Sequence, residues 1–223
     1  MGNICPFRCS FGHPISSDHN HVNGVFPQEK YLLFTAFKAN RKSVLGIVGD
    51  GKVKMYTWPN MGIHDCFFAG DELWFSDSYR MWDGKPGGAI VRNGKFFDEA
   101  YFINHPSEFV RGIAGDKNEI LFGSSFAGSR EARFDGKVEI LLAKGGSVVE
   151  RTDVPFAQVY DIIRMSGEHS DEPAAPKSFD SASKLMDKYL GPPVDELSLL
   201  DAVVGENAKK FSADDIGEID EYL

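Results

Sequence analysis

Three short apolar runs recur along this chain of 223 residues, and their spacing constrains the fold more than any other feature. The runs cover residues 31–34, 72–75 and 119–122, and their anchors Leu32, Leu73 and Ile120 are separated by 41 and then 47 residues. A short turn sequence precedes each run, and a strand ending in a glycine turn follows it. A period of about 40–50 residues is typical of β-propeller blades. We therefore expect the three anchors to be buried at equivalent places in three similar antiparallel units.

The sequence around these runs has the pattern of β-hairpins. Alternating or apolar stretches such as KYLLFTAF, KVKMYTW and KVEILLA are separated by the turn signals GDGK, RNGK and KGGS. No helical periodicity interrupts them. The sequence thus predicts an all-β, propeller-like body over residues 21–166, and a β-sandwich with coincidental spacing is the alternative. At about 45 residues a blade this length supplies three to four blades. The N-terminal segment 1–20 or a second chain would close the ring, or the chain descends from a longer ancestor.

A polar residue lies nine positions before each anchor. These residues are Asn23, His64 and Arg111. The innermost strand of a propeller blade begins near the central channel, so equivalent positions in successive blades converge on one axial pocket. The neighbouring polar residues expected to join this ring are His21, Asp65 and Asp161.

The blade openings HNHVNGVFPQEKYLLFTA, GIHDCFFAGDELWFSDS and VRGIAGDKNEILFGSS resemble those of propellers of the arylsulfotransferase-like and SMP-30-like kind. AQVYDIIRM is similar to the closing strand of related bacterial propellers. The resemblance covers about residues 21–166 and implies the fold. It also implies that a His or Asp before an LWF-type strand faces the channel, as His64 and Asp65 would here. In enzymes of this kind the channel residues hold a divalent metal or supply an acid–base histidine.

Four residues are our candidates for catalysis, namely His64, Asp65, Arg111 and His21. An imidazole near a carboxylate serves as a base, a metal ligand or a hydrogen-bonding pair for substrate. The alternative for His64 and Asp65 is a structural role in capping a strand and a turn. The planar guanidinium of Arg111 matches a carboxylate, phosphate or sulfate, and its alternative is a salt bridge to Asp65 or Asp161.

The segment 77–83 is predicted to link two strands, and it is rich in side chains that contact ligands. Tyr79 and Trp82 are suited to stacking on a sugar or an aromatic ring, and Arg80 to pairing with an anion. Packing on the protein surface is the alternative. Together with Asn23 and Asp161, these three residues complete the predicted ligand-binding set.

The N-terminal segment contains a second candidate site. Cys5, Cys9 and His13 form a C-x3-C-x3-H pattern, and His19 follows closely. Thiolate and imidazole are ligands that zinc prefers, so these four residues are candidate metal ligands, with a loose segment carrying unpaired thiols as the alternative. The predicted cofactor, if the protein has one, is a divalent ion, either calcium in the channel or zinc at this segment.

The charge of the chain is concentrated at its end. The net charge is −9, and residues 167–223 hold fourteen acidic and five basic residues, which accounts for all of it. A neutral body with an acidic tail argues against nucleic-acid binding. Residues 167–179 are predicted to be a linker and residues 180–223 a tail of short amphipathic helices over 181–190, 194–204 and 212–223. These helices must bury their apolar sides against the body or against a partner, and we expect residues 21–166 to fold without them.

Two functions from different classes remain open. The first is a ligand- or protein-binding propeller-like module whose acidic tail docks a protein partner or a second copy. The second is a metal- or histidine-assisted hydrolase, lyase or transferase acting on a small anionic or sugar-like substrate. With three cysteines and no apolar run of about 18 residues, the expectation is a cytoplasmic protein without a membrane span.

Overall fold

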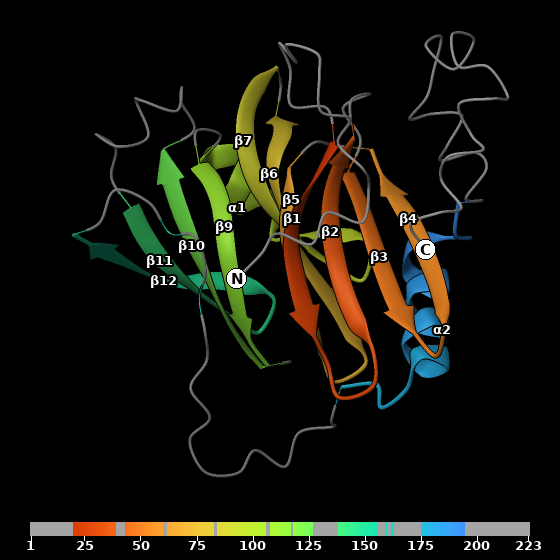
Figure 1. Ribbon diagram of the computed structural model, residues 1–223. Helices are drawn as coiled ribbons and strands as arrows, with labels where there is room; N and C mark the ends of the chain where they lie inside the picture. The colour runs from red at the N-terminus through yellow and green to blue at the C-terminus, as the bar shows by residue number, and fades with distance from the viewer. Residues whose placement is uncertain are drawn as a thin grey trace, which may run out of the picture.

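The computed structural model describes residues 20–38, 43–59, 62–82, 84–105, 108–116, 118–126, 138–155, 159, 162 and 175–194. Over these residues the chain is mostly β-structure, so the prediction of an all-β body is confirmed. Three sheets stand side by side, each with four antiparallel strands joined in sequence order (Figure 1). Neither of the helices in this part of the chain is long and apolar enough to cross a membrane.

The strands of each sheet follow one another along the chain. The first sheet contains β1 (Asn20–Pro27), β2 (Leu32–Lys38), β3 (Ser43–Gly49) and β4 (Lys52–Trp58). The second contains β5 (Ile63–Ala69), β6 (Glu72–Trp82), β7 (Lys85–Arg92) and β8 (Lys95–Phe97). The third contains β9 (Glu108–Gly115), β10 (Glu119–Phe126), β11 (Val138–Lys144) and β12 (Ser147–Val154).

The sequence repeat corresponds to the same strand pair in each sheet, with the same register. The apolar runs form the starts of β2, β6 and β10, and each of these strands pairs with the strand before it. Each pair contains one β-bulge, in which two residues of the first strand lie opposite one residue of the second. The bulged residues are Asn23 and Gly24 opposite Thr35, His64 and Asp65 opposite Ser76, and Arg111 and Gly112 opposite Gly123. The three units are therefore equivalent residue for residue over these strands.

Side chains that alternate along β6 contribute to two hydrophobic cores, one between the first and second sheets and one between the second and third. Leu73 and Phe75 face the first sheet, whereas Trp74 between them faces the third. Among the anchors, Leu73 and Ile120 are buried, but Leu32 is only partly buried, so the expectation of equal burial is wrong for Leu32. The reason is that Leu32 lies on the outer face of the first sheet, in a small cluster with Phe34 and Met55.

The short helix α1 (Glu99–Asn104) lies between β8 and β9 and was not expected from the sequence. With six residues it is too short to show helical periodicity. The Asp98 carboxylate accepts a hydrogen bond from the Tyr101 N–H at its start, and Phe102 is buried in the core between the second and third sheets.

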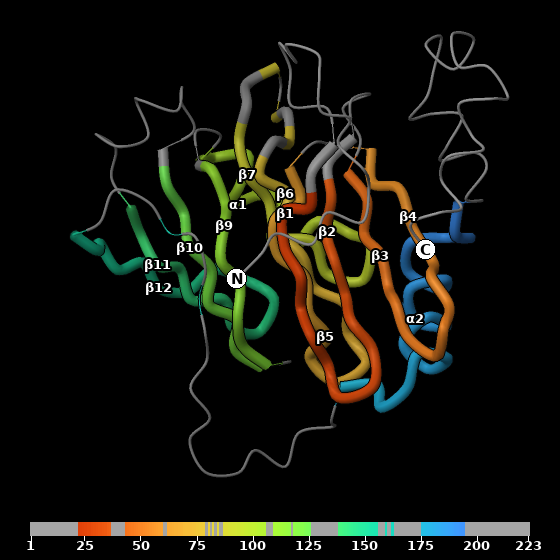
Figure 2. Tube along the Cα trace, viewed as in Figure 1, coloured from red at the N-terminus to blue at the C-terminus, as the bar shows by residue number. Residues whose placement is uncertain are grey.

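Helix α2 (Phe179–Leu190) lies over the range where apolar spacing predicted a helix, and it packs on the body. Ser178 and Ser181 form a capping box at its start. Phe179, Ala182 and Met186 enter the core between the first and second sheets, and Figure 2 shows the helix beside β3 and β4. Residues 195–223 lie outside the described part of the chain, so the helices predicted over 194–204 and 212–223 stay predictions. The predicted boundary near residue 167 also lies outside it and stays a prediction.

The Asp187 carboxylate of α2 accepts hydrogen bonds from Lys54 Nζ and the Tyr56 hydroxyl, both at 2.8 Å. Burial opposes ionisation of Asp187, but the bonds from Lys54 and Tyr56 outweigh it and lower its pKa below 3.8. A carboxylate with a lowered pKa in the folded state contributes stability above its unfolded pKa and loses it as pH falls through the folded pKa.

We therefore expect the stability difference between the wild type and Asp187→Asn to be constant above about pH 5 and to shrink below about pH 4. Urea unfolding at several pH values measures it. A difference that does not change down to pH 2.5 would contradict the role of this ion pair in holding α2.

Candidate functional site

The bulged residues Asn23, His64 and Arg111, here called the bulge row, lie on the three first strands, and β5 contacts both β1 and β9. Asn23 Nδ2 donates a hydrogen bond to the Ile63 carbonyl at 2.6 Å. Arg111 Nη2 lies 2.7 Å from His64 Nδ1. Hydrogen bonds of Asn23 and Arg111 thus connect the three neighbouring first strands, and the shared pocket expected for the three residues stays a prediction.

Arg111 Nη2 also lies 3.3 Å from His64 Nε2. A guanidinium only donates hydrogen bonds, so a ring nitrogen of His64 is the acceptor in this contact. The Phe109 ring supports the pair, with its centroid 5.9 Å from that of His64 and 5.5 Å from Arg111 Cζ. Both His64 and Arg111 are only partly buried.

Asp65 has a different environment from its neighbour His64. It is 6% exposed, and its Oδ2 accepts hydrogen bonds from the Gly112 N–H at 2.9 Å and the Ser76 hydroxyl at 3.2 Å. Its own N–H donates to Ser76 Oγ. The carboxylate therefore ties the bulge of the second sheet to that of the third, which is a structural use of a residue predicted to be catalytic.

Other buried polar side chains connect the sheets, and the sequence analysis did not single them out. Thr35 Oγ1 donates to the His64 carbonyl at 3.1 Å, the Ser78 hydroxyl donates to the Val110 carbonyl, and Trp58 Nε1 donates to Asp77 Oδ2 at 2.8 Å. The sequence feature that could have identified such residues is the small or polar segment after each apolar run, in FTAF, FSDS and FGSS.

The prediction that residues 77–83 link two strands is wrong for 77–82, because β6 continues to Trp82 and pairs with β7. The Arg80 guanidinium lies 4.5 Å from the Phe96 ring centroid and 5.2 Å from that of Trp82. Trp82 belongs to the core between the second and third sheets and donates through Nε1 to the Gly88 carbonyl at 3.1 Å. Arg80 thus covers an aromatic surface, and the Tyr79 side chain is not among those described.

The remaining predicted site residues lie outside what the structure describes. These are Cys5, Cys9, His13, His19 and Asp161, and for His21 only the backbone in β1 is described. Within the described ranges, no three His, Cys, Asp or Glu side chains come together as metal ligands do. Cys66 is buried next to Asp65, and burial, followed by the Asp65 charge, raises its thiol pKa well above the usual value.

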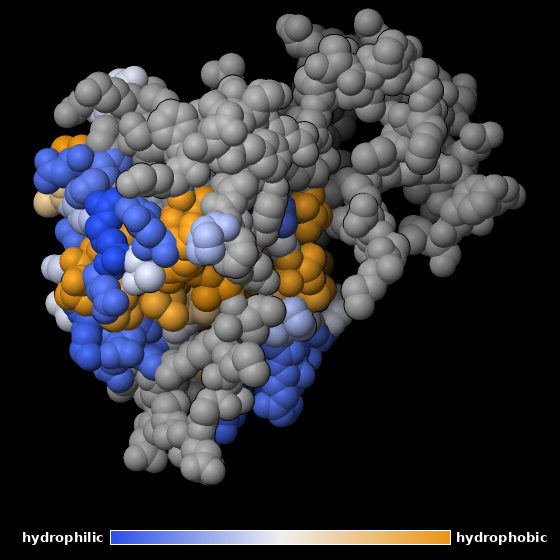
Figure 3. Space-filling model, turned by 90° about the vertical axis from the view of Figure 1, so that its left-hand side faces the viewer, coloured by the Kyte–Doolittle hydropathy of each residue, from blue (hydrophilic) through white to orange (hydrophobic). Residues whose placement is uncertain are grey.

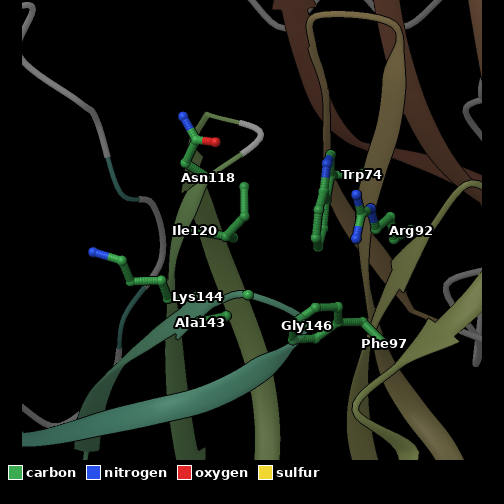
Figure 4. Close-up of a pocket in the computed structure, with 9 residues that line it drawn as sticks. Trp74, Arg92, Phe97, Asn118, Ile120, Ala143, Lys144 and Gly146 are labelled. Carbon is green, nitrogen blue, oxygen red and sulfur yellow. The ribbon is translucent and has the colours of Figure 1, made fainter.

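A cavity of about 330 Å³ lies away from the bulge row, between the second and third sheets (Figure 4). Trp74, Arg92 and Phe97 form its wall on the second sheet. The wall on the third sheet comes from Asn118, Ile120, Ala143, Lys144, Gly145 and Gly146. Figure 4 shows the two groups facing one another across the space. The sequence analysis did not predict this cavity.

Comparison with protein-family models, curated proteins and solved structures found no match for this chain. Its function must therefore be inferred from the geometry of its sites.

Proposed function

We propose that this chain is a propeller-like binding module whose bulge row takes a small anionic ligand. The observation that carries the proposal is the repeated bulge, which places Asn23, His64 and Arg111 at equivalent positions of three adjoining strands. Bulges of this kind re-aim side chains and are common beside binding sites.

The propeller-like part of the proposal rests on how the sheets repeat. Three meanders pack face to face with their first strands adjacent. After the third sheet, Val159 lies against Gly123, where an added Cβ would come within 2.6 Å of it. Gly123 is equivalent to Thr35, which contacts the first strand of the next sheet through the His64 carbonyl. A position of Val159 where the first strand of a fourth unit would lie supports the propeller-like interpretation.

The two outer faces of the stack also fit an open propeller. The outer face of the first sheet holds the small apolar cluster around Phe34, and on the third sheet Leu121 points outward and is 38% exposed. Figure 3, which looks onto the side formed by the third sheet, shows hydrophobic residues gathered in a band between hydrophilic ones. A further unit or a second chain packed there would complete the ring.

The ligand class follows from the chemistry of the row. The guanidinium of Arg111 is always charged, and its planar donors match the oxygens of a carboxylate or a phosphate. The Asn23 amide and the His64 imidazole add further hydrogen-bonding groups. We favour binding over catalysis because the Asp65 carboxylate accepts hydrogen bonds from the Gly112 N–H and the Ser76 hydroxyl, which is a structural use of this side chain.

Substitution at Arg111 tests this proposal. We expect inorganic phosphate or succinate to bind the wild type at low ionic strength, and Arg111→Gln to weaken that binding by about 10- to 100-fold, since a hydrogen bond to a charged group contributes about 1.5–3 kcal/mol. Arg111→Lys should lie between the two, because lysine keeps the charge but loses the planar fork. Isothermal titration calorimetry measures the affinities.

The matched control is Arg151→Gln, which removes an arginine of the same sheet that pairs with Glu139. It should leave the affinity within about twofold. Equal weakening by both substitutions would mean that the anions respond to net charge alone. Turnover of a phosphate or carboxylate ester that requires His64 would favour the enzyme alternative.

A further inference from the structure

We propose that the cavity between the second and third sheets is a docking site for residues 212–223 of this chain, bound as an acidic amphipathic helix. This proposal is independent of anion binding at the bulge row. It begins from helix α2, which occupies the corresponding space between the first and second sheets.

Helix α2 is held there from both sides. Phe179, Ala182 and Met186 pack with Leu33, Ile47 and Tyr56 of the first sheet. On the second sheet, the Tyr189 hydroxyl donates to the Asp71 carbonyl at 3.0 Å. The same helix therefore bridges two neighbouring sheets.

The register of the sheets places the cavity at the equivalent position one sheet further on. Leu33 pairs with Ile47 and Leu45 with Tyr56, as Trp74 pairs with Arg92 and Ile90 with Phe97. The cavity residues Trp74, Arg92 and Phe97 are thus the counterparts of Leu33, Ile47 and Tyr56. On the opposite wall, Asn118 and Ile120 are the counterparts of Asp71 and Leu73.

The two positions differ in what fills them. An added Cβ at Gly94, in the turn between β7 and β8, would lie 2.2 Å from the Tyr189 carbonyl oxygen of α2. At Gly145 and Gly146, in the corresponding turn of the third sheet, an added Cβ would meet no atom of the described residues within 4 Å. Helix α1 covers another part of the space between these sheets with Phe102. The cavity is the part where no described counterpart of α2 lies.

The lining selects the chemistry of the occupant. Its aromatic and aliphatic groups require an apolar stripe, and its two charged side chains, Arg92 and Lys144, are both cationic. Arg92 and Lys144 pair with Glu72 and Glu119, which are not part of the lining. An acidic amphipathic helix matches this combination, as Asp187 of α2 matches Lys54 on the first sheet.

Residues 212–223 carry both features. Ile216, Ile219 and Leu223 recur at helical spacing, and the segment has five acidic residues and no Lys or Arg. Seventeen residues, 195–211, separate it from Val194. Fully extended they span about 56 Å, which exceeds the diameter of about 30–40 Å expected for a body of this size. The segment can therefore reach the cavity of its own chain.

Hydrogen–deuterium exchange of the full chain tests this assignment. We expect amides of 212–223 to exchange at least tenfold more slowly than in a free peptide of the same sequence. Lys144→Glu should reduce that protection at least fivefold. The matched control is Lys52→Glu, because Lys52 has nearly the same side-chain exposure, 61% against 59%, and also pairs with one acidic residue, Asp180. Unchanged protection of β10 and β11 in Lys144→Glu shows that the sheet is intact.

Three results would overturn the proposal. They are exchange of 212–223 at the rate of the free peptide, equal loss of protection in Lys144→Glu and Lys52→Glu, and protection that falls on dilution. The last would show that a second copy supplies the helix. A thiol pair at Asn118→Cys and Tyr222→Cys, in a chain with Cys5 and Cys9 replaced by serine, gives an independent reading. Oxidation should produce a bond within one chain, and a bond only between chains would contradict the assignment.

Discussion

Replacing Phe179 with alanine should lower the free energy of unfolding by about 3–5 kcal/mol, because a large aromatic side chain leaves a closely packed site. Phe179 is 2% exposed at the start of α2, in the core shared by the first two sheets. Its Cβ lies 3.1 Å from the position of an added Cβ on Gly49, so the helix approaches the backbone of β3 closely. Urea unfolding followed by circular dichroism measures the change.

Lys184→Ala is the control for this prediction, since Lys184 is exposed on the same helix and should change stability by less than about 0.5 kcal/mol. A loss below 1 kcal/mol for Phe179→Ala would mean that the sheets fold without α2. From the sequence we expected residues 21–166 to fold without the tail. Because Phe179, Ala182 and Met186 are part of the core, we now expect the body to need α2 for its full stability. Deleting residues 170–223 should destabilise the body, because it removes part of a core as well as an acidic tail.

The repeat could be predicted from sequence because its determinants are local. Apolar runs at 31–34, 72–75 and 119–122 form strands, and the glycine turns end hairpins. The distance of nine residues from the polar residue to its anchor is the same in each unit, and so is the register of the strand pair. The bulges themselves were not predicted, but the polar residue nine positions before each anchor marked where they occur.

Features that depend on packing between sheets could not be read from the sequence. The amphipathic spacing of α2 showed that one side must be buried, but not which surface buries it. The last part of β6, up to Trp82, is stabilised by pairing with β7 and by the contacts of Arg80 with the rings of Trp82 and Phe96. From the sequence alone we interpreted this polar segment as a loop.

At the bulge row the structure shows contacts between residues that the sequence singled out, whereas their binding or catalytic roles stay predictions. The spacing brought His64 and Arg111 together, and they lie in contact. The sequence could not show that Asp65 faces Gly112, because that orientation depends on the bulge, which interrupts the simple alternation of side chains along β5.

Asp65→Ala should lower the free energy of unfolding by about 2–4 kcal/mol, because the buried Gly112 N–H loses a charged acceptor and bonds to charged groups contribute about 1.5–3 kcal/mol. Asp65→Asn keeps an acceptor oxygen, so its loss should be smaller. Asp71→Ala removes an exposed aspartate from the turn that follows β5 and should change stability by less than about 0.5 kcal/mol.

The substitution Asp65→Asn also tests whether the structural role of Asp65 affects ligand binding at the bulge row. Gly112 follows Arg111 directly and has a φ of 67°, in the left-handed region that glycine adopts readily. Its N–H donates a hydrogen bond to Asp65 Oδ2, which links the Asp65 carboxylate to the backbone beside Arg111. If Asp65 holds Arg111 in position, Asp65→Asn should weaken phosphate binding by at least threefold while the protein stays folded at 25 °C. Unchanged affinity in Asp65→Asn would show that the charge of the Asp65 carboxylate is not needed to position Arg111.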